Sequence, residues 1–80
     1  MNEDKNLYYC TDLSLASALV LKFPIDKIDS ANTKKVVFIF IDSTQLQNNI
    51  ENFWNNSMRV SPLEYFNSIR NLKTRIYSNG

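Results

Sequence analysis

Basic and aromatic side chains recur near the end of the chain at spacings that place them on one side of a helix. At about 100° per residue, Phe66, Lys73 and Tyr77 fall close together and Arg70 borders them. A basic strip with interleaved aromatic rings can clamp phosphates and stack bases, as proteins that bind single-stranded nucleic acids do. The alternative is structural, because a lysine on an apolar face also snorkels to solvent or pairs with an acidic residue.

Charge is distributed unevenly along the sequence. Residues 1–32 carry three lysines against five acidic residues, a net charge of −2, whereas residues 33–80 carry six basic residues against three acidic ones, a net charge of +3. This basic second part favours DNA or RNA as a partner. The predicted contact residues are Lys34, Lys35, Arg59, Arg70, Lys73, Arg75 and Tyr77.

A second interpretation rests on the single tryptophan of the chain. Trp54 lies on the apolar stripe of a predicted helix, so burial is its default state. The polar residues Asn55 and Asn56 beside it favour a position in which the edge of the Trp54 ring is at the surface. Exposed tryptophan is enriched in protein-binding hot spots. Trp54, Tyr65 and the predicted sheet therefore define the alternative function, a protein-interaction or homodimerisation module such as a phage-type adaptor or inhibitor.

The composition argues against catalysis. The chain has no histidine, one cysteine and one glycine, which excludes a Ser-His-Asp triad, a His-based zinc site and a glycine-rich phosphate loop. Asp12 and Asp42 are explained more simply as helix caps than as a catalytic pair. We expect a protein that is not an enzyme and that holds no metal and no cofactor.

With 80 residues the chain is long enough for one small domain, predicted over residues 7–80 after a disordered N-terminus at residues 1–6. Its lone Cys10 fits a reducing compartment, so we expect a cytoplasmic protein. No stretch reaches the ~18 apolar residues that a membrane span needs.

Three helices and three strands are predicted. A first helix follows a cap at Thr11 or Asp12 and ends at Pro24. The second begins at Asp42, which forms a capping box with Gln45, and ends at residues 55–57. The third begins with Ser at the cap, Pro in the first turn and Glu at the third position, and its apolar face is predicted to comprise Tyr65, Phe66, Ile69, Leu72 and Ile76.

The strands are predicted at residues 7–10, 25–29 and 36–41. The third strand is apolar throughout and does not alternate, so we expect both of its faces to be covered. It becomes the centre of a three-stranded, mostly antiparallel sheet in an α+β fold of order β-α-β-β-α-α. Because three short helices are few for two faces, a homodimer in which a second copy covers one face is also predicted.

Nearly the whole chain resembles a family of short bacterial and phage domains catalogued only as a domain of unknown function. The resemblance rests on four stretches: Tyr9-Cys10-Thr11-Asp12-Leu13 leading to Ala16, Leu19 and Phe23; Val37-Phe38-Ile39-Phe40; Phe53-Trp54-Asn55 with Val60; and Tyr65-Phe66 with Leu72-Lys73-Thr74-Arg75-Ile76-Tyr77. In the family a glycine usually precedes the residue matching Phe23, where this chain has Lys22. The resemblance implies a stand-alone α+β domain and transfers no functional residue.

Overall fold

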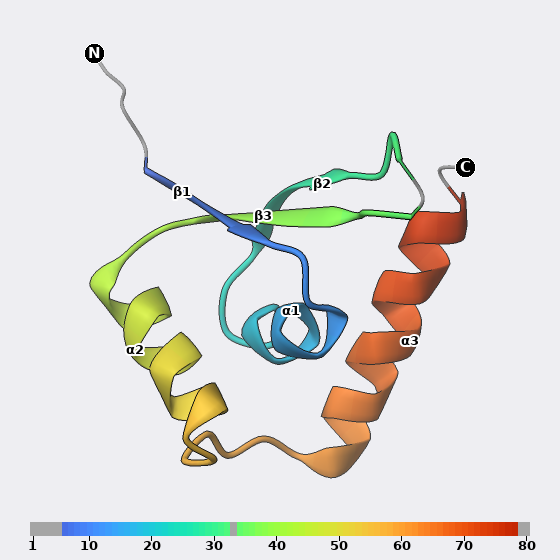
Figure 1. The fold of residues 1–80 in the computed structure, drawn as a ribbon. Coiled ribbons are helices and arrows are strands. Elements are labelled where there is room, and N and C mark those ends of the chain that lie inside the picture. The colour runs from blue at the N-terminus through green and yellow to red at the C-terminus, as the bar shows by residue number, and fades with distance from the viewer. Residues whose placement is uncertain (1–5, 33, 79–80) are drawn as a thin grey trace.

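Three strands and three helices make up residues 6–32 and 34–78, the part of the chain that the computed structural model describes (Figure 1). They are β1 (Leu7–Cys10), α1 (Leu13–Leu19), β2 (Ile25–Asp29), β3 (Val37–Ile41), α2 (Thr44–Trp54) and α3 (Pro62–Ser78). The predicted α+β fold and its element order are confirmed. The disorder predicted for residues 1–6 concerns, apart from Asn6, residues outside the described part.

The strands form one antiparallel sheet of order β1-β3-β2, with β3 at the centre as predicted. Opposite Ile39 of β3 lie Tyr9 of β1 and Lys27 of β2. The register between β2 and β3 shifts between Ile25 and Lys27, so one residue of β2 is left without a partner there. Side chains of paired residues point to the same face of the sheet, so Tyr9, Ile39 and Lys27 share one face.

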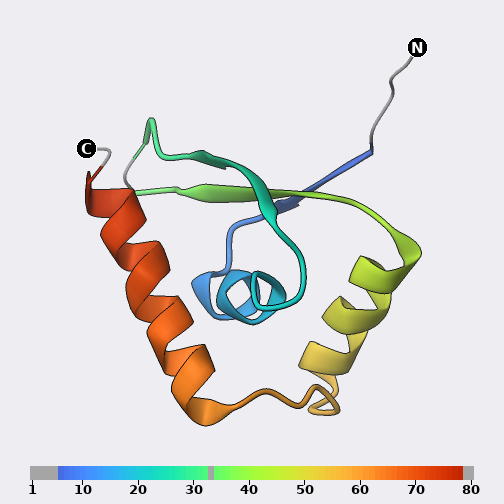
Figure 2. The ribbon, with the colours of Figure 1, turned by 180° about the vertical axis from the view of Figure 1, so that it is seen from behind.

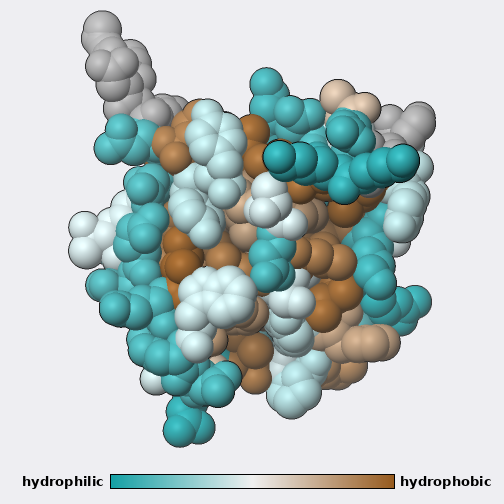
Figure 3. All heavy atoms as spheres, viewed as in Figure 1, coloured by the Kyte–Doolittle hydropathy of each residue, from teal (hydrophilic) through white to brown (hydrophobic). Residues whose placement is uncertain are grey.

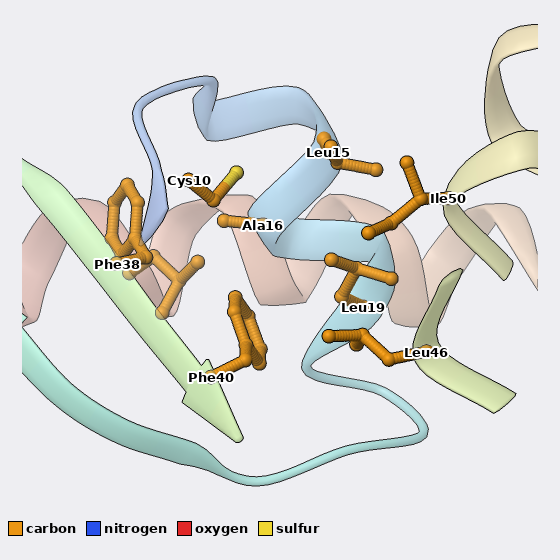
Figure 4. Packing of buried hydrophobic residues seen from close by; sticks show 9 residues of the cluster. Cys10, Leu15, Ala16, Leu19, Phe38, Phe40, Leu46 and Ile50 are labelled. Atoms are coloured by element: carbon orange, nitrogen blue, oxygen red, sulfur yellow. The ribbon is translucent and has the colours of Figure 1, made fainter. Parts of the chain in front are cut away.

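All three helices lie on the opposite face. In Figures 1 and 2, α1 lies beneath the middle of the sheet while α2 and α3 stand on either side of it. Phe38 and Phe40 of β3 point toward α1, with Cys10 and Ala16 beside Phe38 and Leu19 on the side of Phe40 (Figure 4). The core cluster of buried residues comprises Cys10, Leu15, Ala16, Leu19, Phe38, Phe40, Leu46, Ile50 and Leu72.

The sequence predicts that both faces of β3 are covered, by helices or by a second copy; in the structure the helices cover only one of them. Ile39 is only 8% exposed but does not belong to the core cluster, and Ile41 on the same face is 44% exposed. The cause lies in the connections of α1. Two residues join β1 to α1, and both α2 and α3 pack against α1, so α1 holds all the helices on its own side of the sheet.

Two helix boundaries differ from the prediction. The helix α1 ends at Leu19 and not at Pro24, because the turn tightens where the Leu21 amide donates to the Ala18 carbonyl. The N-cap of α2 is Ser43, whose Oγ accepts from the Leu46 amide at 3.0 Å. Asp42, the predicted cap, instead accepts from the Ser43 amide and from the Gln47 side chain.

Candidate functional site

The orientation of α3 is fixed by polar contacts with α1. The Ser68 hydroxyl donates to the Ser17 carbonyl at 2.8 Å in a buried contact, and the Tyr65 hydroxyl donates to the Ser14 carbonyl at 3.0 Å. Leu72 completes the buried side and is 2% exposed. These contacts hold one side of α3 against α1 and leave its other sides at the surface.

One exposed flank of α3 carries the basic and aromatic residues that the sequence singled out. Phe66 is 58% and Tyr77 76% exposed, and Arg70 and Lys73 are exposed between them. The Arg70 guanidinium carbon lies 5.9 Å from the centroid of the Phe66 ring, within the range of a cation–π contact. We call Phe66, Arg70, Lys73 and Tyr77 the α3 strip.

The prediction that Phe66 lies on the apolar face of the helix is wrong, because Phe66 is exposed. Neighbouring residues on a helix point about 100° apart, so only one member of the Tyr65-Phe66 pair can face α1. Tyr65 takes that position, because its hydroxyl finds the Ser14 carbonyl there. Lys73 does not intrude on the core either, since it lies on the exposed flank with Phe66.

Lys34 and Lys35 extend the basic surface beyond the end of α3. Both are exposed in the turn between β2 and β3, which the ribbon views place beside the C-terminal end of α3 (Figures 1 and 2). The backbone of Asn32 accepts from the Lys35 amide and its side chain accepts from the Lys34 amide, both at 2.9 Å. These hydrogen bonds give the backbone that carries the two lysines a defined turn conformation.

The two remaining basic residues are separated from the strip. Arg59 lies in the connection between α2 and α3, at the opposite end of α3 from the turn that carries the lysines (Figure 1). Arg75 is two residues from Lys73, about 200° around the helix, and lines a hollow of about 580 Å³ together with Glu64. Spacing along the chain did not predict this hollow, whose other polar lining residues are Asn67, Ser68, Asn71 and Thr74.

The residues of the protein-interaction alternative also meet. Trp54 and Tyr65 line one hollow of about 350 Å³ with Ala18, Phe53, Asn56, Met58 and Val60. Trp54 is 61% exposed, so the default expectation of burial is wrong. Phe53 takes the inward position, and the Trp54 ring meets it edge-on with the centroids 5.0 Å apart. Seen from the direction of Figure 1, hydrophobic residues lie across the middle of the molecule between hydrophilic outer sides (Figure 3).

The groups with catalytic potential are engaged structurally. Asp12 accepts from the amides of Ser14 and Leu15 as the N-cap of α1. Burial raises the pKa of the Cys10 thiol, which donates to the Asp12 carbonyl at 3.3 Å, so the unreactive protonated form is favoured. In the described part of the chain, no group of three or more acidic, cysteine or histidine residues is arranged to hold a metal ion.

None of the helices described here is both long and apolar enough to cross a membrane. The sequence profile of one family, Domain of unknown function (DUF5659), matches residues 5–78. No curated protein and no solved structure matches the chain. The match confirms the resemblance to a small uncharacterised domain over almost the whole length, and it assigns neither an activity nor a ligand.

Proposed function

The chain belongs to the DUF5659 family, a domain of unknown function, and we propose from its geometry that it is a non-enzymatic module that binds single-stranded nucleic acid through the α3 strip. One observation carries the proposal: Phe66, Arg70, Lys73 and Tyr77 are all exposed on one flank of a single helix. Cations for phosphates and rings for bases are therefore presented side by side.

The dimensions of the strip suit a short stretch of polynucleotide. From Phe66 to Tyr77 the helix rises by about 16 Å at 1.5 Å per residue. That length equals about five steps of B-form DNA at ~3.4 Å per step along one strand. Lys34 and Lys35 lie beyond the C-terminal end of the helix, where they would meet a strand that continues past Tyr77.

We also propose a cellular location for this protein. A free thiol at Cys10 stays reduced in a reducing compartment, so we place the module in the cytoplasm. Its small size, and the structural roles of Asp12 and Cys10, suit an accessory protein of a bacterium or a phage, which the resemblance noted above favours.

The test is titration of labelled single-stranded DNA, single-stranded RNA and duplex DNA at several salt concentrations, followed by fluorescence anisotropy. The double variant Arg70→Gln/Lys73→Gln removes two phosphate contacts from the strip. It should bind more weakly and flatten the slope of log K against log salt by about 1.4, at ~0.7 per single-strand contact. Tyr77→Ala should weaken single-strand binding by ~1–3 kcal/mol if the ring stacks on a base.

The double variant Arg59→Gln/Arg75→Gln is the matched control. It removes the same net charge from positions that the structure separates from the strip, so it should retain the wild-type slope. Equal losses in the two double variants would show that only overall charge matters. Absence of binding at low salt, with circular dichroism showing a folded protein, would refute the proposal.

A second candidate function is supported by the hollow beside Trp54. Exposed tryptophan next to an apolar hollow is typical of a site that accepts an apolar side chain of a protein partner. Trp54 is the only tryptophan, so its intrinsic fluorescence reports directly on this site. A partner that binds here should shift the emission, and Trp54→Ala should abolish its binding while Arg70→Gln/Lys73→Gln leaves it unchanged.

A further inference from the structure

A row of polar side chains runs along the flank of α3 that turns away from the α3 strip. It comprises Glu64, Asn67, Asn71 and Arg75, all of them exposed, and it lines the hollow of about 580 Å³ between α3 and the end of α1. Residues three or four apart on a helix are neighbours, so these side chains follow one another along α3. We call this hollow the α1–α3 hollow.

The α1–α3 hollow also has an apolar part. Val20 and Leu21, at the end of α1, are partly buried, and Leu72 of α3 is 2% exposed. Binding sites typically combine an apolar lining with a few polar groups that orient the ligand, in a volume of about 300–1,000 Å³. The α1–α3 hollow agrees with this description in both its lining and its size.

The two charges of the row lie at its two ends. At about 1.5 Å per residue, Glu64 and Arg75 are separated by about 16 Å along the helix, which is too far for them to pair with each other. The row therefore favours a ligand with a cation at one end and an anion at the other. An extended peptide of about five residues has this length, at ~3.3 Å per residue.

The middle of the row suits the main chain of such a peptide. Each asparagine amide offers both donors and an acceptor, which match the carbonyl and the N–H of a peptide group. Asn67 and Asn71 are about 6 Å apart along the helix. The main-chain groups on one edge of an extended chain recur every second residue, at ~6.6 Å, so both asparagines can bind the same segment.

We propose that the α1–α3 hollow binds an extended segment of a partner protein. A basic side chain of the segment lies beside Glu64, an acidic side chain lies beside Arg75, and the main chain between them follows Asn67 and Asn71. A nucleic acid fits less well, because Glu64 repels phosphate and the described lining includes no aromatic ring for a base. Among the described residues, this hollow shares none with the α3 strip or with the hollow beside Trp54, so the inference does not depend on the proposed function.

NMR titration of isotope-labelled protein tests the main-chain contacts. The probes are the peptides Lys-Val-Ala-Val-Glu and Glu-Val-Ala-Val-Lys, blocked at both ends, because the segment can run in either direction along α3. At millimolar concentration, one of them should shift the side-chain amide signals of Asn67 and Asn71 but not that of Asn48, which is exposed on α2. Asn71→Ala should weaken binding about three- to tenfold, and Asn48→Ala is the matched control. If neither peptide shifts the two signals, the proposal is overturned.

Double-mutant cycles with the bound peptide test the charged contacts. Glu64→Gln should weaken binding about two- to fivefold, the range of an exposed ion pair, and should have no effect on a peptide with Gln in place of Lys. Arg75→Gln should depend in the same way on the Glu of the peptide. The matched controls, Glu51→Gln on α2 and Arg59→Gln, make the same charge changes outside the hollow and should retain wild-type binding. Additive effects in either cycle, or equal losses in the controls, would overturn the proposal.

Discussion

Adjacent aromatic residues decide what this molecule shows at its surface. In both Phe53-Trp54 and Tyr65-Phe66, one ring faces the interior and the other is more than half exposed. The two members of such a pair point about 100° apart on a helix, and either fits an apolar stripe when only the sequence is known. Which one turns inward depends on tertiary partners, such as the Ser14 carbonyl that accepts from Tyr65.

The buried thiol of Cys10 makes a prediction about alkaline pH. Burial raises its pKa above the ordinary value of 9.0, so the folded state holds the thiol proton more tightly than the unfolded chain does. This contribution to stability is therefore complete below pH 9.0 and is lost as the pH rises through the folded-state pKa. Burial also raises the pKa of Tyr8 above 10.0, which adds a further decline at higher pH.

The measurement is the thermal midpoint as a function of pH, from neutral to well above these values. Wild type should be level near neutrality and then decline. Cys10→Ala should decline less steeply on the alkaline side, whatever its midpoint at neutral pH, because it has no thiol to ionise. Parallel curves for the two proteins would contradict this assignment.

At the scale of elements, the sheet was predictable and its covering was not. The central place of residues 37–41 follows from a continuous apolar run, and the charged segment Ile25–Asp29 next to it suits an edge strand. Periodicity does not predict which side of a sheet a helix will occupy, so only the structure shows that the helices leave one face of the sheet uncovered. The N-cap of α2 was displaced by one residue, because Asp42 and Ser43 are both suitable acceptors.

The part of the candidate site that lies within one helix was predictable, and the parts that join different elements were not. The α3 strip follows from spacing within one helix, which is local information. Two other features depend on segments that are distant in sequence, which spacing within one helix does not predict. Lys34 and Lys35 lie beside the end of α3, and Trp54 and Tyr65 line one hollow. Arg59 and Arg75 were grouped with the others by charge alone. Charge carries no positional information, so it could not predict that the fold separates these two residues from the strip.

At the scale of the whole molecule, the helix α1 is the centre of the structure. It lies beneath the middle of the sheet, between α2 and α3 (Figures 1 and 2). All five residues from Leu15 to Leu19 are buried, and α1 is in contact with β1, α2 and α3. A small chain with one such central element has little apolar area elsewhere to compensate for damage to it.

Leu19→Ala should therefore be among the most damaging single changes in this protein. Leu19 is 0% exposed and lies near Phe40 and Leu46 in Figure 4. Truncation of a buried leucine costs ~2–5 kcal/mol, which includes the cavity that is left. A domain of this size has about 4–12 kcal/mol of stability in total, so the variant should unfold at much lower urea concentration.

Leu63→Ala is the matched control. It removes the same atoms at a position that is 68% exposed, and should change stability by no more than ~0.5 kcal/mol. If Leu19→Ala proves unfolded, the volume-conserving Leu19→Met should still fold and lose less than ~1.5 kcal/mol. Similar urea midpoints for the Leu19→Ala and Leu63→Ala variants would show that α1 is not the centre on which the fold depends.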